Sequence, residues 1–299
     1  MKKLLVALVV FVAASTIHAQ DKEAPEVPPN GWNKTGNVQL LLNQSAFNKE
    51  WTGGGTSSIA GNLTLNYDFN YRMDDFTWDN RILANYGLTK LKDDEFARKT
   101  SDRVEFNSIA GKQIKETKWY YSYFLNFRSQ LAKGYEFSED LETGETIRTE
   151  TTHFLSPGYL QTGPGILWKY NEYLSVNVAP ATARLIFVDD KFTSVPGYID
   201  GDYFGVAQGK TTRFEFGASI GVYAKMFLLE NVTADHTLNL YSNYLDEPGN
   251  IDIDYLLNVE MSINNYLSAN LIFQAIYDDN TVGAFQIREV FGLGVNHKF

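Results

Sequence analysis

Three of the four histidines could take part in acid–base chemistry, but none stands in a pattern that such chemistry requires. His153 lies in a long polar stretch, His236 lies on the apolar face of an alternating segment, and His297 is near the last residue. None of them has a serine or a carboxylate at a spacing that suggests a nucleophile and its base. We therefore expect loop or interfacial histidines, no catalytic residue and no enzymatic activity.

The patterns for metal and phosphate chemistry are equally incomplete. Segment 188–210 contains Asp189, Asp190, Asp200 and Asp202, and carboxylates are the hard oxygen ligands that calcium prefers. No complete calcium-binding loop is present, so we expect an ordinary solvated acidic loop. The glycine run at 53–55 does not follow a strand and open a helix, as a phosphate-binding loop does. The sequence thus predicts neither a metal site nor a cofactor.

Charged residues near strand ends form the one constellation that points to a function. They recur on the polar faces of predicted strands: Arg103, Glu105, Arg128, Arg213, Glu215, Asp252, Asp254 and Arg288. If these strands form a barrel whose termini lie at the rim of short turns, all eight side chains point into the lumen at about one height. In lipid, each charge would cost ~2–4 kcal/mol near the membrane midplane. Arg184 would join this ring only if Pro180 bulges its strand.

This ring of charges has two interpretations. A ring of mixed charge in a water-filled pore selects ions or polar solutes. Alternatively, arginine–carboxylate pairs cross-link the wall and plug the barrel. A twelve-stranded lumen is intermediate between filled eight-stranded barrels and open porins, so its size does not decide. The lower lumen would be lined by Asn, Ser and Gly, which slightly favours the filter because such a lining needs water.

Alternating segments position these residues. The last segment, 285–299, places Phe285, Ile287, Phe291, Leu293, Val295 and Phe299 on one face and mostly polar residues on the other. Successive strand side chains point to opposite faces, so this pattern predicts a strand with one apolar side. Twelve strands are predicted, at 34–43, 57–70, 76–89, 102–115, 118–131, 159–170, 173–187, 211–224, 232–244, 251–264, 266–277 and 285–299. The last should close on the first, since an open apolar edge would recruit other chains.

The connections between the predicted strands alternate in length. Those at 44–56, 90–101, 132–158 and 188–210 are long, whereas those at 71–75, 116–117 and 171–172 are short. Outer-membrane barrels show this pattern, with the long loops outside the cell. The alternative is a secreted soluble barrel or sandwich with its apolar face inward. Strand length and aromatic residues near strand ends favour lipid on the outside: Trp78, Tyr86, Trp119, Trp168, Tyr255 and Tyr277.

The N-terminal segment has the features of a signal peptide. Lys2 and Lys3 precede an apolar core, and a cleavage site follows near Ala19. The predicted organisation is a signal peptide at 1–19, a flexible periplasmic segment at 20–33 and a barrel at 34–299. The chain contains no cysteine, which excludes disulfides, thiol catalysis and a lipoprotein anchor. Without the two lysines, the net charge of −10 falls to near −12, which argues against a nucleic-acid partner.

Five runs of the sequence are similar to those of a known family. They are FNKEWTGGGTSSIAGN, FTWDNRILANYGLTKL, RKTSDRVEFNS, KWYYSYFLNFRSQLAKGYEF and SNYLDEPGNIDIDYLLNVEMSINNYLSANLIFQAIYDD. Over nearly the whole mature length, the chain resembles an outer-membrane β-barrel family catalogued as a domain of unknown function (DUF3078). The resemblance implies a transmembrane barrel in the outer membrane of a Gram-negative cell, and it supplies no activity.

Together these patterns predict an all-β protein, a transmembrane antiparallel up-and-down β-barrel of about twelve strands. We expect a narrow channel or port for small polar solutes or ions. The first alternative is a closed barrel with a structural or partner-binding role through its long extracellular loops, and the second is an outer-membrane enzyme. The expected partners are outer-membrane lipid, a small polar solute and the barrel-assembly machinery, which would read Phe299 as an assembly signal.

Overall fold

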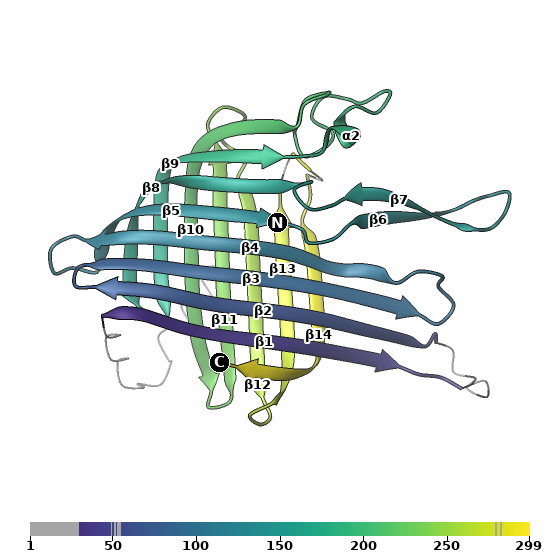
Figure 1. Ribbon diagram of the computed structural model, residues 1–299, viewed down its shortest axis with the longest axis horizontal. Coiled ribbons are helices and arrows are strands. Elements are labelled where there is room, and N and C mark those ends of the chain that lie inside the picture. Colours follow the sequence, from purple (N-terminus) through teal and green to yellow (C-terminus); the bar gives the residue numbers. More distant parts are fainter. Residues whose placement is uncertain (1–29, 49, 51, 53–54, 279, 282) are drawn as a thin grey trace.

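The chain forms a closed barrel of twelve antiparallel strands (Figure 1). The computed structural model describes residues 30–299 apart from 49, 51, 53–54, 279 and 282, so the predicted signal peptide lies outside the described residues. The barrel strands are β1 (Gly31–Ser45), β2 (Ser58–Met73), β3 (Phe76–Leu91), β4 (Arg98–Gln113), β5 (Trp119–Ser129), β8 (Gly158–Asn171), β9 (Leu174–Phe187), β10 (Thr212–Leu229), β11 (Val232–Asn243), β12 (Asp252–Ser262), β13 (Leu267–Tyr277) and β14 (Gln286–Lys298). Each pairs with its chain neighbours, except that β5 pairs with β8 and β14 closes onto β1.

All twelve predicted strands are confirmed, with some shifted ends. β1 begins at Gly31, so residues 31–33 belong to the barrel rather than to a flexible segment. β4 begins at Arg98, earlier than predicted, because a bulge in its pairing with β3 accommodates the extra residues. β10 extends to Leu229, which leaves a two-residue turn, 230–231, where a longer connection was expected.

The connection between β5 and β8 contains structure that the sequence analysis missed. β6 (Gly134–Glu139) and β7 (Thr146–Thr152) pair as a hairpin that projects beyond the rim of the barrel (Figure 1). Its turn places Gly144 in the left-handed region, at a φ of 71°. The next long connection holds a one-turn helix, α2 (Asp190–Thr193). We call the hairpin and the connection that holds α2 the cap.

The outer surface of the barrel is apolar and its interior is polar. On β14, Ile287, Phe291 and Leu293 are each more than half exposed, whereas Gly292 and Asn296 on the other face are buried. A soluble barrel would show the opposite arrangement, so the outward face is one that meets lipid. Near the short-turn rim, indole rings pack against one another: Trp32 with Trp78, and Trp119 with Trp168. The barrel is therefore transmembrane. No helix in the described part of the chain is long and apolar enough to cross a membrane.

Pro180 interrupts the pairing of β9 on both sides. The register of β9 slips at this point against β10 and against β8. Proline has no N–H to donate, so a bulge is the arrangement that it tolerates within a sheet. Beyond the bulge, Arg184 points inward and is only 5% exposed. The sequence analysis expected Arg184 to join the lumen-facing charges only if Pro180 bulges its strand, and this bulge is present.

The barrel closes where β1 meets β14. Residues 37–42 pair with 293–298 at six positions, and the last residue of the sequence continues this seam. Gly36 and Phe299 exchange two backbone hydrogen bonds, of 2.7 and 2.9 Å. The Phe299 ring stacks on Tyr67, with the ring centroids 6.0 Å apart, and it lies where a Cβ on residue 36 would be. Gly36 is thus the residue that lets Phe299 pack over the seam.

We expect Gly36→Val and deletion of Phe299 each to lower the amount of folded barrel. The first forces the Phe299 ring away, and the second removes two backbone bonds, worth about 1–3 kcal/mol together. The folded, heat-modifiable band on unboiled gels measures this loss. Gly61→Val is the matched control, because a Cβ there meets only Leu42, at 3.8 Å. If all three variants assemble like the wild type, the seam does not depend on the packing of Phe299.

The alternation of loop lengths predicts the orientation of the barrel. The cap should be extracellular and the tight turn at 172–173 periplasmic. An epitope tag inserted at Gly144, at the tip of the hairpin, should be labelled on intact cells, whereas a tag at Glu172 should be labelled only after permeabilisation. The reverse pattern would overturn this topology.

Candidate functional site

Asp254 on β12 receives two arginines from the opposite wall of the barrel. Its Oδ2 lies 2.8 Å from Arg103 Nη1 on β4 and 2.6 Å from Arg128 Nη1 on β5. Five strands separate β4 from β12 in either direction around the barrel, so the Arg103–Asp254 bond crosses the lumen. Arg103 also pairs with Glu105 on its own strand. One carboxylate thus joins the two halves of the barrel wall through its interior.

A second set of ion pairs joins β9, β10 and β12 beside the first. Arg184 Nη1 on β9 lies 2.5 Å from Asp252 Oδ2 on β12 and 3.3 Å from Glu215 Oε2 on β10. Its guanidinium also lies over the ring of Tyr241, 3.6 Å from the centroid, a cation–π contact. We call the seven charged residues of the two sets the outer tier: Arg103, Glu105, Arg128, Arg184, Glu215, Asp252 and Asp254.

The buried carboxylates of the outer tier have hydrogen-bond donors. Glu105 is only 1% exposed, and it accepts from Arg103, from Asn107 at 2.9 Å and from Asn126 at 2.8 Å. Asp254 accepts from Gln274 at 3.2 Å in addition to its arginines. A buried charge is tolerated when it is paired and its remaining lone pairs are satisfied. Glu105 and Asp254 meet both conditions, whereas Glu215 Oε1 is buried without a hydrogen bond.

Arg213 lies at the mouth of the barrel and holds the loops. Its Nε is 3.0 Å from Glu215 Oε1, within ion-pair distance but without the geometry of a hydrogen bond. The Arg213 guanidinium also donates to the Gly205 carbonyl oxygen at 3.0 Å and to Asn280 Oδ1 at 2.9 Å, and it pairs with Asp246 at 3.0 Å. Arg213, a member of the predicted ring, thus contacts residues of three connections. It contacts the outer tier through its ion pair with Glu215.

Arg288 is the predicted ring member that stands apart from the outer tier. Its guanidinium approaches two amide oxygens, Asn85 Oδ1 at 3.3 Å and Gln274 Oε1 at 3.4 Å. Among the described residues, it forms no ion pair. Arg288 thus faces neutral amides on β3 and β13 rather than a carboxylate.

The interior beside the seam is filled by side chains. Gln39 donates to Asn270 and to Asn296, each at 2.8 Å, and Asn296 donates to Ser268 at 2.7 Å. All four residues are less than 5% exposed. The sequence analysis took such a lining to need water, but here the amides satisfy one another. On this side of the lumen, the polar lining does not favour an open filter.

A second layer of bridges lies toward the short-turn rim, and the sequence analysis missed it. Arg81 on β3 pairs with Asp68 on β2 at 2.5 Å. The same guanidinium lies over the ring of Tyr223 on β10, 4.4 Å from the centroid, and Tyr223 donates to Asp235 at 2.9 Å. At least four strands separate β3 from β10 around the barrel, so this contact also crosses the lumen.

Lys169 and Asp79 complete the second layer. The Lys169 Nζ on β8 lies 3.0 Å from Asp79 on β3, across the width of β5 and β4. We call these residues the inner tier: Asp68, Asp79, Arg81, Lys169, Tyr223 and Asp235. Alternation does place these side chains on the inward faces of their strands. It could not show that they meet across the barrel, since that depends on strand tilt and on the curvature of the wall.

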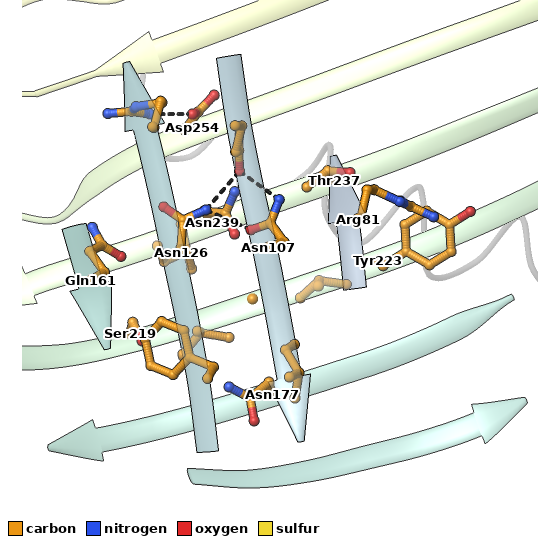
Figure 2. A pocket seen from close by; sticks show the side chains of 18 of the residues that line it. Arg81, Asn107, Asn126, Gln161, Asn177, Ser219, Tyr223, Thr237, Asn239 and Asp254 are labelled. Atoms are coloured by element: carbon orange, nitrogen blue, oxygen red, sulfur yellow. Dashed lines mark hydrogen bonds and ion pairs between the residues drawn. The ribbon is translucent and has the colours of Figure 1, made fainter. Parts of the chain in front are cut away.

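A cavity of about 220 Å³ lies between the tiers, and we call it the chamber. On one side, β9, β10 and β11 line it with amide and hydroxyl groups: Asn177, Ser219, Thr237 and Asn239. On another side, β4, β5 and β8 contribute the apolar side chains Ile109, Phe124 and Leu167. Figure 2 shows Asn107 and Asn126 together at the outer tier and Arg81 beside Tyr223. The volume is many times the ~10–15 Å³ that one water requires.

His153 directly follows β7 and lies between two carboxylates of the cap. Its Nδ1 is 3.0 Å from Glu150 Oε1, and its Nε2 is 3.2 Å from Asp189 Oδ2. Lys133 and Lys191 also donate to Glu150, and these bonds hold the pKa of Glu150 at about 2, so that it stays ionised. This cluster ties β7 to the connection that holds α2.

The other two histidines lie on the outer face of the barrel. His236 shares a hydrogen bond of 2.9 Å with the Tyr255 hydroxyl, and the His297 ring stacks on Phe299. In the part of the chain that the structure describes, neither is bonded to a serine or threonine hydroxyl. Within those same residues, no group of three or more His, Asp or Glu is placed to hold a metal ion.

Solved structures with some similarity to this chain are remote from it. The COG4313 outer membrane channel from Pseudomonas putida F1 shares 10% identity at a TM-score of 0.39, covering 93% of this chain and 99% of that chain. The translocator domain of the autotransporter NalP from Neisseria meningitidis shares 10% at a TM-score of 0.41, covering 99% and 98%. The Pseudomonas putida toluene transporter TodX shares 6% at a TM-score of 0.32, covering 91% and 89%. Because these TM-scores are low, the similarities support no argument about this chain.

No curated protein matches the chain. A family model does match part of it, at residues 42–135, and that family is described as a protein of unknown function (DUF3078). The match contains Arg103, Glu105 and Arg128 of the outer tier, whereas the last of the five similar runs lies beyond it. From the end of β1 to the start of the hairpin, the resemblance seen in the sequence is thus confirmed as one to the DUF3078 family.

Proposed function

We propose that this protein is an outer-membrane port for small polar solutes, and that the two tiers close its lumen at rest. The observation that carries the proposal is the chamber, a cavity with polar and apolar walls between two layers of side-chain bridges inside a transmembrane barrel. Outer-membrane location is supported by the apolar outward face, the aromatic residues at the rim and the signal-peptide features of residues 1–19.

The chemistry of the closure supports a port over a permanent plug. The bridges across the lumen are ion pairs and a cation–π contact, which can exchange partners while every backbone bond of the barrel stays intact. A barrel that never opens would gain more from apolar packing, because replacing buried ion pairs with apolar residues is often stabilising by about 1–4 kcal/mol. Retained charges therefore fit a lumen in which water or a solute takes the place of a bridge.

A closed barrel that binds a partner through its outer side is the second candidate, and the cap favours it. Arg148 on β7 lies between the rings of Phe96 and Tyr135, 4.6 and 4.9 Å from their centroids. Together with the cluster around Glu150, this contact fixes the hairpin in a projecting position. An ordered loop of this kind suits recognition of another molecule. Conductance measurements separate this candidate from the port.

Removing a crossing pair should open the lumen. The double variant Arg128→Gln with Asp254→Asn abolishes both ion pairs of Asp254 and leaves the net charge of the tier unchanged, because it removes one charge of each sign, and Arg103 still pairs with Glu105. In planar bilayers, we expect near-zero single-channel conductance for the wild type and clear, unselective conductance for the double variant. Because the Arg103–Asp254 and Arg128–Asp254 pairs bridge the lumen beside the chamber, their loss should widen the path for ions.

The matched control for this experiment is an exposed ion pair. Lys112 and Asp75 lie 3.6 Å apart at the short-turn rim, both more than half exposed. Neutralising them together should leave conductance unchanged. Equal conductance above zero in the wild type and the double variant would show that the outer tier does not close the lumen. Silence in both would favour the second candidate.

Asp254→Asn alone should behave differently from the double variant. It leaves two arginines facing a neutral amide, and losing one partner of a buried ion pair costs ~3–5 kcal/mol. The folded band should therefore melt at a lower temperature than that of the double variant, and the reversal potential in a salt gradient should shift toward anions. Arg288→Ala is the comparison, because Arg288 makes no ion pair within the described residues. If Asp254→Asn melts at the same temperature as the double variant, ion pairing does not determine the stability of the outer tier.

A further inference from the structure

Several side chains of the chamber keep hydrogen-bonding groups unused. Within the described residues, the side chains of Thr237 and Asn239 form no hydrogen bond, and both line the chamber. Asn126 donates through its Nδ2 to the outer tier, which leaves its Oδ1. Asn177 accepts at Oδ1 from Ser122, which leaves its Nδ2. The chamber thus offers both donors and acceptors, and they come from neutral groups.

The charges around the chamber are already paired. Apart from Asp278 at the outer mouth, every charged residue that lines the chamber takes part in an ion pair. A charged solute would either bring an uncompensated charge into a buried site or break one of these pairs. The chamber therefore discriminates against ions of both signs.

Part of the wall is apolar. Phe124 and Leu167 are each less than 10% exposed, and with Ile109 they form a surface that offers no hydrogen bond to a solute. A wholly apolar ligand would fit this surface but would leave the amides of β9 and β11 without partners, which is costly in a buried site. The lining calls for a molecule with one apolar face and hydroxyl groups at its edge.

We propose that the chamber binds a neutral saccharide of the size of one hexose ring. A hexose has C–H groups on its ring faces and hydroxyls around its edge, and each hydroxyl both donates and accepts. The ring faces would lie on Phe124 and Leu167, and the hydroxyls would bond to Thr237, Asn239 and Asn177. This inference rests on the proposed port function, since it names the class of solute that the port admits.

The test compares three molecules that share one ring. Purified full-length protein in detergent is titrated by calorimetry with glucose, with glucuronate as the anion and with glucosamine as the cation. Glucose should bind saturably, and the two charged analogues should bind at least about tenfold more weakly. Benzene is added as an apolar probe and should not compete with glucose. Tighter binding of either charged analogue or of benzene would overturn the assignment.

Variants locate the binding in the chamber. Thr237→Val and Asn239→Leu each remove hydrogen-bonding groups with little change in shape, and should weaken glucose binding by about three- to tenfold. Thr233→Val is the matched control: the residue lies on the same face of β11, outside the chamber, and glucose affinity should not change. All three variants are first checked for the folded band. Equal affinity in all of them would place glucose elsewhere and overturn the inference.

A second readout separates the ligand from the port. Liposomes that contain the protein are placed in glucose, and their swelling measures passage through the barrel. Swelling without saturable binding would overturn the saccharide site and leave the port. Saturable binding without swelling would support the site and overturn the port. Binding and swelling that are both reduced by Thr237→Val would support the two proposals together.

Discussion

The hydrocarbon core of a bilayer contains no water, so every backbone N–H and C=O of a strand that crosses it must be bonded to another strand. This constraint decides the fold. Twelve strands satisfy it only by closing β14 onto β1, and the seam carries six residue pairs together with the bonds between Gly36 and Phe299. Once the sheet is closed, the alternation of side chains has a single consistent solution, with apolar residues toward lipid and polar residues toward the lumen.

The same constraint determines what happens inside the barrel. Charges that cannot face lipid are brought together across a narrow lumen, where water screens them poorly and pairing is strongly favoured. Arg103 and Arg128 therefore converge on Asp254, and Arg81 reaches Tyr223 from the opposite wall. The chamber is the space that these bridges enclose. Its neutral lining follows as well, since the charged residues around it are taken up by the two tiers.

The sequence predicted the wall of this barrel well because a period of two is a local property. Ile253 and Tyr255 face lipid and Asp252 and Asp254 face the lumen, as alternation requires. The position of Arg184 was predictable only as a condition, because Pro180 permits a bulge without demanding one. Contacts across the lumen were beyond sequence reasoning. Asp254 lies more than a hundred residues from Arg128, and their distance depends on tilt and curvature rather than on any local pattern.

The cap was missed for a different physical reason. The segment from Gly134 to Thr152 is polar and rich in charge, a composition that predicts a solvated loop. Its hairpin is held by contacts to other parts of the chain, among them Arg148 with Phe96 and Glu150 with Lys191. Such contacts stabilise a strand pair that its own sequence would not, because an isolated hairpin is marginally stable in water.

Glu215 connects the mouth of the barrel to its interior. One of its oxygens faces Arg184 in the outer tier, and the other faces Arg213, which bonds to three connections at the mouth of the barrel. If the Arg184–Glu215 pair breaks, Arg213 therefore remains as the counter-charge of Glu215. If Arg213 moves away with the loops, Arg184 remains. Either change keeps the carboxylate paired, so neither leaves an isolated buried charge. In the proposed port, this arrangement lets the bridges open one at a time from the mouth of the barrel, as the entry of a solute into the chamber requires.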